Sequence, residues 1–373
     1  MIESVIFFFS GSGMVMLFIL FMRINVVGSK SKLVKHRSKE PGFVDLLIYA
    51  SVVDDGVIVG KDGSLMAAWA YQGVDSNSST EAERDQVSLQ INHALSRMGS
   101  GWMIHIDAVR KPAPGYSTKD DSHFPDPVSA AIDEERREFF ERVGTLYESN
   151  YVITATYLPP LLAQQKFVEL MFDDEGVPVD SKTRTIALLN HFKRECANIE
   201  SHLSSVFRMK RLKGKTITKE DNSSVNYDAF LRWIQFCISG LDHPVILPKN
   251  PIYLDALLSG QEFWGGVVPK IGQNFIQVVS IEGFPLASSP GLINSLADLP
   301  CLYRWSTRFI FMDTHEAVGH LEKFSKKWKQ KIRSFFDQVF NSHSSNVDQN
   351  AINMVSDAQA AIAETNSGEV AQG

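Results

Sequence analysis

The chain has 373 residues, of which 44% are hydrophobic and 21% are charged, a balance that fits a globular protein of two or three domains. Its formal net charge of −6 at pH 7 argues against a protein whose whole surface is built for nucleic acid. Cys196, Cys237 and Cys301 lie far apart, so their spacing fits reduced thiols better than a disulfide framework or a zinc site.

The first 25 residues contain a long apolar run in which Ser4–Ile24 has no charge before Arg23. About 20 helical residues span the roughly 30 Å hydrocarbon layer of a bilayer, so the run predicts an N-terminal transmembrane helix. The alternative is a cleaved signal peptide, but the run lacks a basic start and a small-x-small cleavage site. The side chains expected to face lipid are Phe7, Phe8, Phe9, Leu17, Phe18 and Leu20.

A basic linker over residues 26–42 follows this run. Its five basic side chains are Lys30, Lys32, Lys35, Arg37 and Lys39. Positive charge next to a transmembrane helix marks the cytoplasmic side, so we expect the bacterial inner membrane with the bulk of the chain in the cytoplasm. The flank has two interpretations that stay open, a stop-transfer signal alone or a contact with anionic lipid.

The stretch from Phe43 to Gly73 predicts a β-hairpin. Val57–Val59 and Leu65–Tyr71 are two apolar runs around the turn signal Asp62-Gly63, and Asp54-Asp55-Gly56 marks an earlier turn. Thr80 and Glu83 then have the spacing of a capping box, which predicts a helix that ends at Gly99 or Gly101.

The following elements alternate between strand and helix. Trp102–Val109 and Tyr151–Leu158 read as strands around a charged helix over Ile132–Val143. His105 and Asp107 share one face of the first strand, which suggests a solvated face more than a metal or acid–base pair.

The second half predicts a long helix over 183–207 and a helix over Tyr227–Ser239. It also predicts strands over Phe275–Ile281 and Tyr303–Met312, the latter central in its sheet, and an amphipathic helix over Leu321–Phe340. The residues 360–373 read as a helix end, a turn and the start of a strand. Trp69, Trp102 and Trp305 lie in or beside apolar strand runs, so we expect them in the core.

The expected fold class is therefore α+β, with an N-terminal transmembrane helix followed by mixed helices and a mainly antiparallel sheet. The expected domains are the transmembrane helix at 1–25, the basic linker at 26–42, α+β subdomains at 43–165 and 166–345, and a C-terminal tail at 346–373.

Three motifs resemble functional sites, and two of them fail on spacing. Gly214-Lys215-Thr216 lacks the glycine that a phosphate-binding loop carries five positions before its Gly-Lys, because that position is Met209. His315 and His320 are five residues apart and so cannot share one ligand face of a helix. The basic run Arg208–Lys219 suggests a solvated loop or an acidic protein partner, with nucleic-acid contact as the alternative.

Four blocks, Phe43–Trp69, Leu95–Tyr116, His123–Phe140 and Cys301–Asp313, resemble in order the opening of the conjugal-transfer TrbE proteins, in the VirB/TrbE/CagE family of type IV secretion ATPases. None of these blocks is a catalytic motif, so we expect no catalytic, cofactor-binding or metal-binding residues in this chain. The resemblance implies a region that leads into a RecA-like motor domain, and ATP and Mg²⁺ are expected only for that motor domain. Its absence here suggests a split gene, a truncated gene or an expression fragment.

The resemblance implies a component of a type IV secretion or conjugal transfer system that takes part in pilus assembly and substrate transfer, here as an N-terminal docking half. The expected partners are the membrane and other secretion subunits, including a TrbD-like small membrane protein. The full-length family is expected to form homo-oligomers, and nucleic acid is not expected as a partner. The alternative is a membrane-anchored nucleic-acid-binding protein that uses Arg208–Lys219; salt-dependent DNA binding would favour it.

Overall fold

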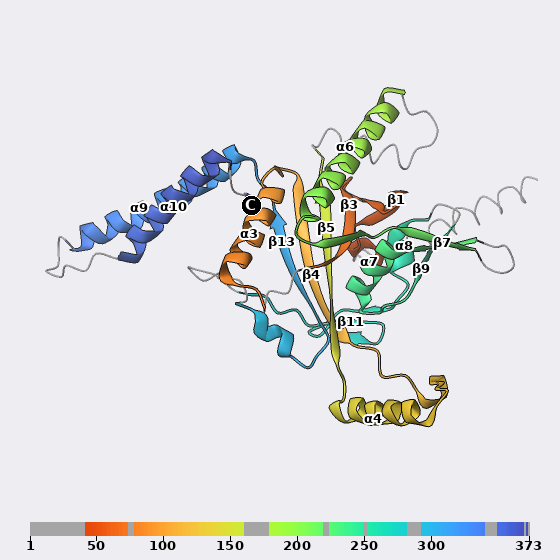
Figure 1. The fold of residues 1–373 in the computed structure, drawn as a ribbon. Coiled ribbons are helices and arrows are strands. Elements are labelled where there is room, and N and C mark those ends of the chain that lie inside the picture. The colour runs from red at the N-terminus through yellow and green to blue at the C-terminus, as the bar shows by residue number, and fades with distance from the viewer. Residues whose placement is uncertain are drawn as a thin grey trace, which may run out of the picture. The chain divides into compact units, whose positions relative to one another are not determined.

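A computed structural model describes residues 42–73, 78–159, 179–218, 224–248, 252–281, 292–339, 349–368 and 371. The chain divides into two compact units, Met1–Ile48 and Tyr49–Gly373. In the first unit the structure describes the short helix α2 (Phe43–Leu46). All elements below belong to the second unit (Figure 1).

The main sheet joins seven strands of the described residues, and every pairing in it is antiparallel. Their order is β1-β2-β3-β5-β4-β13, and β6 pairs with the second half of β3. The strands are β1 (Tyr49–Asp54), β2 (Val57–Gly60), β3 (Leu65–Gln72), β4 (Trp102–Pro112), β5 (Tyr147–Tyr157), β6 (Arg208–Arg211) and β13 (Tyr303–Ile310).

The predicted hairpin is confirmed as β2 and β3, in which Ile58 pairs with Met66. The turn holds itself closed, because the backbone N–H of Gly60 donates to the carbonyl of Ser64 at 2.7 Å and Ser64 donates to the Asp62 carboxylate. The predicted capping box is also confirmed at the start of α3 (Glu81–Leu95), where Thr80 accepts from the backbone N–H of Glu83.

The hydrophobic core lies between one face of this sheet and α6 (Val179–Leu203). Phe192 of α6 stacks on Trp102 of β4, with ring centroids 5.7 Å apart. Trp69 of β3 is fully buried and donates from its indole N–H to Glu200 of α6 at 2.9 Å. A helical stripe on α6 supplies the rest of this contact through Phe192, Cys196, Ile199 and Leu203.

The opposite face of the sheet meets α7 (Ala229–Ser239), since Arg304 on β13 contacts both Asp107 of β4 and Cys237 of α7. The helix α8 (Leu254–Leu258) packs against β1, and two small antiparallel sheets contact α7 or the carbonyl of Ser239 at its end. These sheets consist of β7 (Gly214–Thr218), β8 (Ser224–Asp228) and β9 (Val245–Leu247), and of β10 (Phe263–Trp264), β11 (Lys270–Ile271) and β12 (Asn274–Phe275).

The remaining elements lie around the sheet. Between β4 and β5 come the 3-10 turn η1 (Lys119–Asp121) and the helix α4 (Pro127–Val143), and η2 (Asn294–Asp298) precedes β13. The helix α9 (Thr314–Val339) packs against α10 (Gln349–Ser367). Near its end the chain returns to α3, where the N–H of Ala371 donates to Asn92 at 2.8 Å.

The expected α+β fold with a mainly antiparallel sheet is confirmed. The expectation that this fold includes a transmembrane helix is corrected. None of the described helices is both long and apolar enough to cross a membrane. The residues expected to face lipid or to form the basic flank lie outside the described residues. They are Phe7, Phe8, Phe9, Leu17, Phe18, Leu20, Lys30, Lys32, Lys35, Arg37 and Lys39.

Several local expectations are also wrong. The strand expected over Phe275–Ile281 is limited to β12, and β13 is an edge strand because only β4 pairs with it among the described residues. Trp69 and Trp102 are buried as expected, whereas Trp305 on this edge is only partly buried. The strand expected after α10 falls mostly outside the described residues. The division of the body into subdomains at residue 165 stays a prediction.

Candidate functional site

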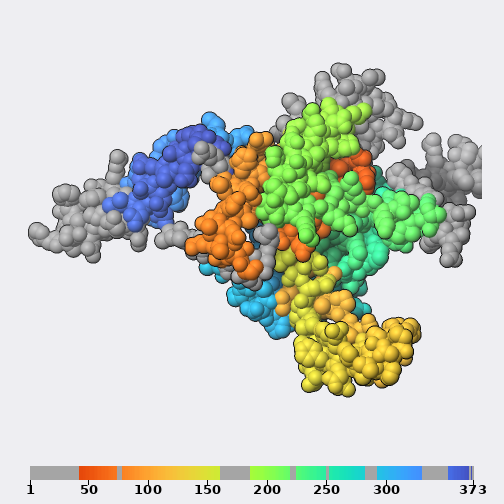
Figure 2. All heavy atoms as spheres, viewed as in Figure 1, coloured from red at the N-terminus to blue at the C-terminus, as the bar shows by residue number. Residues whose placement is uncertain are grey.

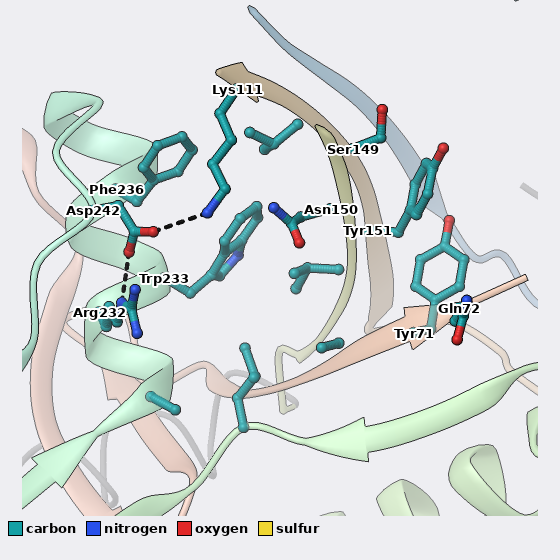
Figure 3. Close-up of a pocket in the computed structure, with 15 residues that line it drawn as sticks. Tyr71, Gln72, Lys111, Ser149, Asn150, Tyr151, Arg232, Trp233, Phe236 and Asp242 are labelled. Carbon is teal, nitrogen blue, oxygen red and sulfur yellow. Dashed lines mark hydrogen bonds and ion pairs between the residues drawn. The ribbon is translucent and has the colours of Figure 1, made fainter. Parts of the chain in front are cut away.

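A cavity of about 540 Å³ lies between α7 and the ends of three sheet strands, β3, β4 and β5. Figure 3 shows Trp233 and Phe236 on the α7 side and Ser149, Asn150 and Tyr151 on the strand side. The other lining residues are Ala70, Tyr71, Gln72, Val109, Lys111, Val152, Leu212, Ala229, Arg232 and Asp242.

Aromatic rings form two sides of the cavity. The rings of Trp233 and Phe236 stack with centroids 5.9 Å apart, and those of Tyr71 and Tyr151 lie 5.6 Å apart. Burial raises the pKa of Tyr71 to about 12, so its hydroxyl keeps its proton at neutral pH. Rings combined with hydroxyl and amide groups suit an amphipathic side chain or a short peptide segment.

An ion-pair bridge joins the two walls of the cavity (Figure 3). Asp242 accepts from Arg232 at 2.6 Å and from Lys111 at 3.1 Å. The hydrogen bond from Arg232 is the main reason that the pKa of Asp242 is lowered, and Lys111 adds to the effect. Burial opposes the charge of Lys111, but its hydrogen bonds to Asp242 and Glu148 outweigh burial and raise its pKa. Asp242 and Lys111 therefore keep their charges at neutral pH, and the bridge links Arg232 of α7 to Lys111 of β4.

The local sequence around α7 explains why this helix can hold one wall. Asp228 caps its first turn by accepting from the N–H of Leu231 at 2.9 Å, and Gly240 ends it in the left-handed region with φ of 74°. One side of α7 is buried through Phe230, Leu231 and Ile234. The other side carries Arg232, Trp233 and Phe236, which line the cavity.

A polar cluster around the buried Asp107 ties α7 to the sheet beside the cavity. Arg304 lies 3.7 Å from the Asp107 carboxylate and donates to the backbone carbonyl of Cys237 at 3.5 Å. Burial raises the pKa of Tyr49 and of Cys237 to about 12 each, so neither group ionises at neutral pH. The expectation that His105 and Asp107 lie on a solvated face is wrong for Asp107, which is 5% exposed. The cluster is better explained as support for α7 than as an acid–base pair.

The Gly-Lys-Thr motif forms part of strand β7, in antiparallel register with β8. The N–H of Gly214 donates to the Asp55 carboxylate at 2.8 Å, and Lys215 is exposed. A phosphate-binding loop needs free N–H groups turned towards one point before a helix, which a paired strand does not supply.

The basic run Arg208–Lys219 is not the expected loop, because its described residues form β6 and β7 apart from the connection at Leu212 and Lys213. Arg211 lies over the Trp69 ring at 4.4 Å and donates to the carbonyl of Gly56 at 3.1 Å, so it serves the core. His315 and His320 both lie on α9, and among the described residues no three histidine, cysteine, aspartate or glutamate side chains form a metal-binding group.

The cavity was not predicted from the sequence. Trp233 was identified only as part of a helical apolar pattern, and Lys111, Arg232 and Asp242 carried no motif. A weak signal existed, since Arg232 and Asp242 flank the helix-ending Gly240. Nothing in the sequence showed that Lys111, more than a hundred positions earlier, would join them.

Fold and site together define an α+β module with an aromatic-lined cavity, whose described residues hold the Gly-Lys-Thr motif in a strand. Two known protein families match parts of this chain. Residues 56–165 match the N-terminal domain of the type IV secretion system ATPase VirB4/TrbE. Residues 215–373 match the CagE, TrbE, VirB family, a component of the type IV transporter system.

Individual relatives give the same result. The conjugal transfer protein TrbE of Rhizobium radiobacter is 43% identical over 334 residues, which are 89% of this chain and 40% of that protein. Sinorhizobium fredii has two relatives, which are named as the first and second portions of a probable conjugal transfer protein TrbE. The first portion is 49% identical over 125 residues, 34% of this chain and 84% of that protein. The second portion is 42% identical over 183 residues, 49% of this chain and 28% of that protein.

The chain therefore belongs to the TrbE-type conjugal transfer proteins of the VirB/TrbE/CagE family of type IV secretion ATPases. It spans about 40% of the length of the Rhizobium radiobacter relative.

Proposed function

We propose that this chain is a docking component of a conjugal transfer type IV secretion system, in which it contributes to pilus assembly and substrate transfer. Its membership of the family supports this role, and the observation that carries the docking part is the cavity between α7 and the sheet. The cavity receives an amphipathic side chain or short segment from another secretion subunit of this membrane-associated apparatus. A TrbD-like small membrane subunit and further copies of the chain are candidate partners.

The proposal includes no nucleotide chemistry by the Gly-Lys-Thr motif. Gly214 already donates its N–H to Asp55, and the neighbouring strand β8 pairs with β7 through Lys215. An exposed lysine in water contributes about 0–1 kcal/mol to an ion pair, too little to select a triphosphate. ATP and Mg²⁺ are proposed to act in a motor domain of the kind that the family name implies.

A nucleic-acid role has less support. Arg211, within the basic run, packs over the Trp69 ring and donates to the Gly56 carbonyl. Salt-dependent binding of DNA, reduced when the exposed Arg208 and Lys210 are replaced, would favour this second role.

The test is the frequency of plasmid transfer from a donor strain that carries variants in place of the parent gene. Ser149→Trp places a large ring at the exposed strand side of the cavity, and we expect at least a tenfold lower transfer frequency. The matched control Ser88→Trp makes the same change on an exposed position of α3 and should transfer normally. Lys215→Ala should also transfer normally, and the purified protein should show no Mg-ATP binding that this change removes.

Equal transfer by Ser149→Trp and Ser88→Trp, with both proteins present at parental levels, would refute a role for the cavity. Loss of transfer in Lys215→Ala, together with loss of Mg-ATP binding, would instead assign a nucleotide site to β7.

A further inference from the structure

The connection between β4 and β5 carries an exposed apolar face that the fold does not use. We define residues 113–146, which include η1 and α4, as the α4 arm; Figures 1 and 2 show α4 beyond the ends of these two strands. Val128, Ile132, Phe139 and Val143 are 67%, 53%, 54% and 48% exposed. Their spacing of four, seven and four residues places them on one side of the helix.

The arm holds its own shape through the other side of α4. Tyr116 stacks on Phe140 with centroids 5.2 Å apart and donates its hydroxyl to Asp133 at 2.7 Å. Arg137 binds the same carboxylate at 2.6 Å and donates to the backbone carbonyl of Ser117 at 3.1 Å. The N-cap Asp126 accepts from the backbone N–H groups of Val128 and Ser129. The exposed apolar side is therefore not needed to fold the arm, and a row of large apolar side chains in water marks an interaction surface.

The net charge of the α4 arm indicates which class of partner this arm can bind. Residues 113–146 hold eight carboxylates against four basic side chains, a formal charge of −4 at pH 7. Glu135 borders the apolar row, Glu138 lies further round the same flank of the helix, and the exposed Arg142 lies between them. The carboxylates of Glu135 and Glu138 have no hydrogen bond or ion pair to any described residue. A negative arm repels nucleic acid and anionic lipid, and it also repels a second α4 arm of the same charge.

We propose that the α4 arm docks a basic amphipathic helix of a protein partner. The apolar row of the partner helix covers Ile132 and Phe139, and its lysine or arginine side chains meet Glu135 and Glu138, as in helix-in-groove and coiled-coil recognition. This assignment rests on the docking function proposed above, but it concerns a surface separate from the cavity at α7.

The test uses the purified full chain and two synthetic helical peptides. One peptide is built from leucine and lysine and the other has glutamate at every lysine position, so that both share the same apolar row. Fluorescence anisotropy should show binding of the lysine peptide and at least tenfold weaker binding of the glutamate peptide. Ile132→Glu with Phe139→Glu should weaken binding of the lysine peptide at least tenfold. The matched control, Leu89→Glu with Ile186→Glu, changes two side chains that are 68% and 59% exposed on α3 and α6 and should bind like the parent.

A charge-reversal variant gives a second result that does not depend on whether the Ile132/Phe139 variant folds. Glu135→Lys with Glu138→Lys should exchange the preference, so that the glutamate peptide binds more tightly than the lysine peptide. Equal binding of the lysine peptide by the parent and by the Ile132/Phe139 variant would overturn the proposal. Self-association of the parent that this variant abolishes would also overturn it, because a second copy would then be the occupant. Failure here leaves the cavity unaffected, since the plasmid-transfer test of Ser149→Trp does not involve the arm.

Discussion

Trp69→Ala is expected to lower the free energy of unfolding by about 3–5 kcal/mol, the usual cost of removing a large buried aromatic side chain. Trp69 is 0% exposed at the centre of the main sheet. Its ring contacts the guanidinium of Arg211 at 4.4 Å, and its N–H donates to Glu200 at 2.9 Å. The change leaves a cavity and also removes partners from two charged side chains, so the loss should lie in the upper part of this range.

Chemical denaturation followed by circular dichroism checks this expectation without relying on tryptophan fluorescence. Trp69→Phe keeps a ring beneath Arg211 and loses the hydrogen bond to Glu200, so it should cost less than Trp69→Ala. Trp264→Ala removes a side chain that is 59% exposed and should change the stability by no more than about 0.5 kcal/mol. If Trp69→Ala were as stable as Trp264→Ala, the assignment of the core between β3 and α6 would be wrong.

Gly56→Ala is the second change with a large expected effect, about 2–4 kcal/mol of destabilisation. Gly56 has φ of +69° in the turn between β1 and β2, and a Cβ atom there would lie 2.6 Å from the backbone oxygen of Leu212. In the same turn the Gly56 carbonyl accepts a hydrogen bond from Arg211, and the Asp55 carboxylate accepts one from the N–H of Gly214. A shift of Gly56 would therefore disturb β6 and β7 as well as the turn.

Gly368→Ala separates the cost of the left-handed backbone conformation from the cost of the collision with Leu212. Gly368 has φ of +70°, and no atom of a described residue lies within 4 Å of the position that its Cβ would take. It should show only the conformational cost, about 1–2 kcal/mol. Thermal unfolding of both variants measures the difference, which reports the collision with Leu212. Similar losses in the two variants would show that the backbone of Leu212 does not press on the turn.

The sequence predicted the elements whose signals are local. The Asp62-Gly63 turn and the Thr80–Glu83 capping box appear in the structure where they were expected, because each depends on neighbouring residues alone. The resemblance to the TrbE proteins was also recognisable from the sequence, and the family matches confirm it.

What the sequence did not predict depends on contacts between distant segments. Asp107 reads as a polar residue on a strand face, but α7 and Arg304 cover it. Tyr303–Met312 reads as a central apolar strand, although only β4 pairs with β13 within the ranges that the structure describes. The cavity needs Lys111, Arg232 and Asp242 to meet, and no periodic pattern records that meeting.

We propose that the cavity at α7 docks another subunit of the secretion apparatus. The most direct measurement places a photoreactive benzoyl-phenylalanine at Gln72, an exposed residue that lines the cavity, in donor cells that assemble the apparatus. The matched control places it at the exposed Gln90 on α3. Irradiation should link Gln72, but not Gln90, to a protein that mass spectrometry identifies as a type IV secretion subunit, and Ser149→Trp should abolish the link. No link at Gln72, or the same link from Gln90, would contradict docking at this cavity.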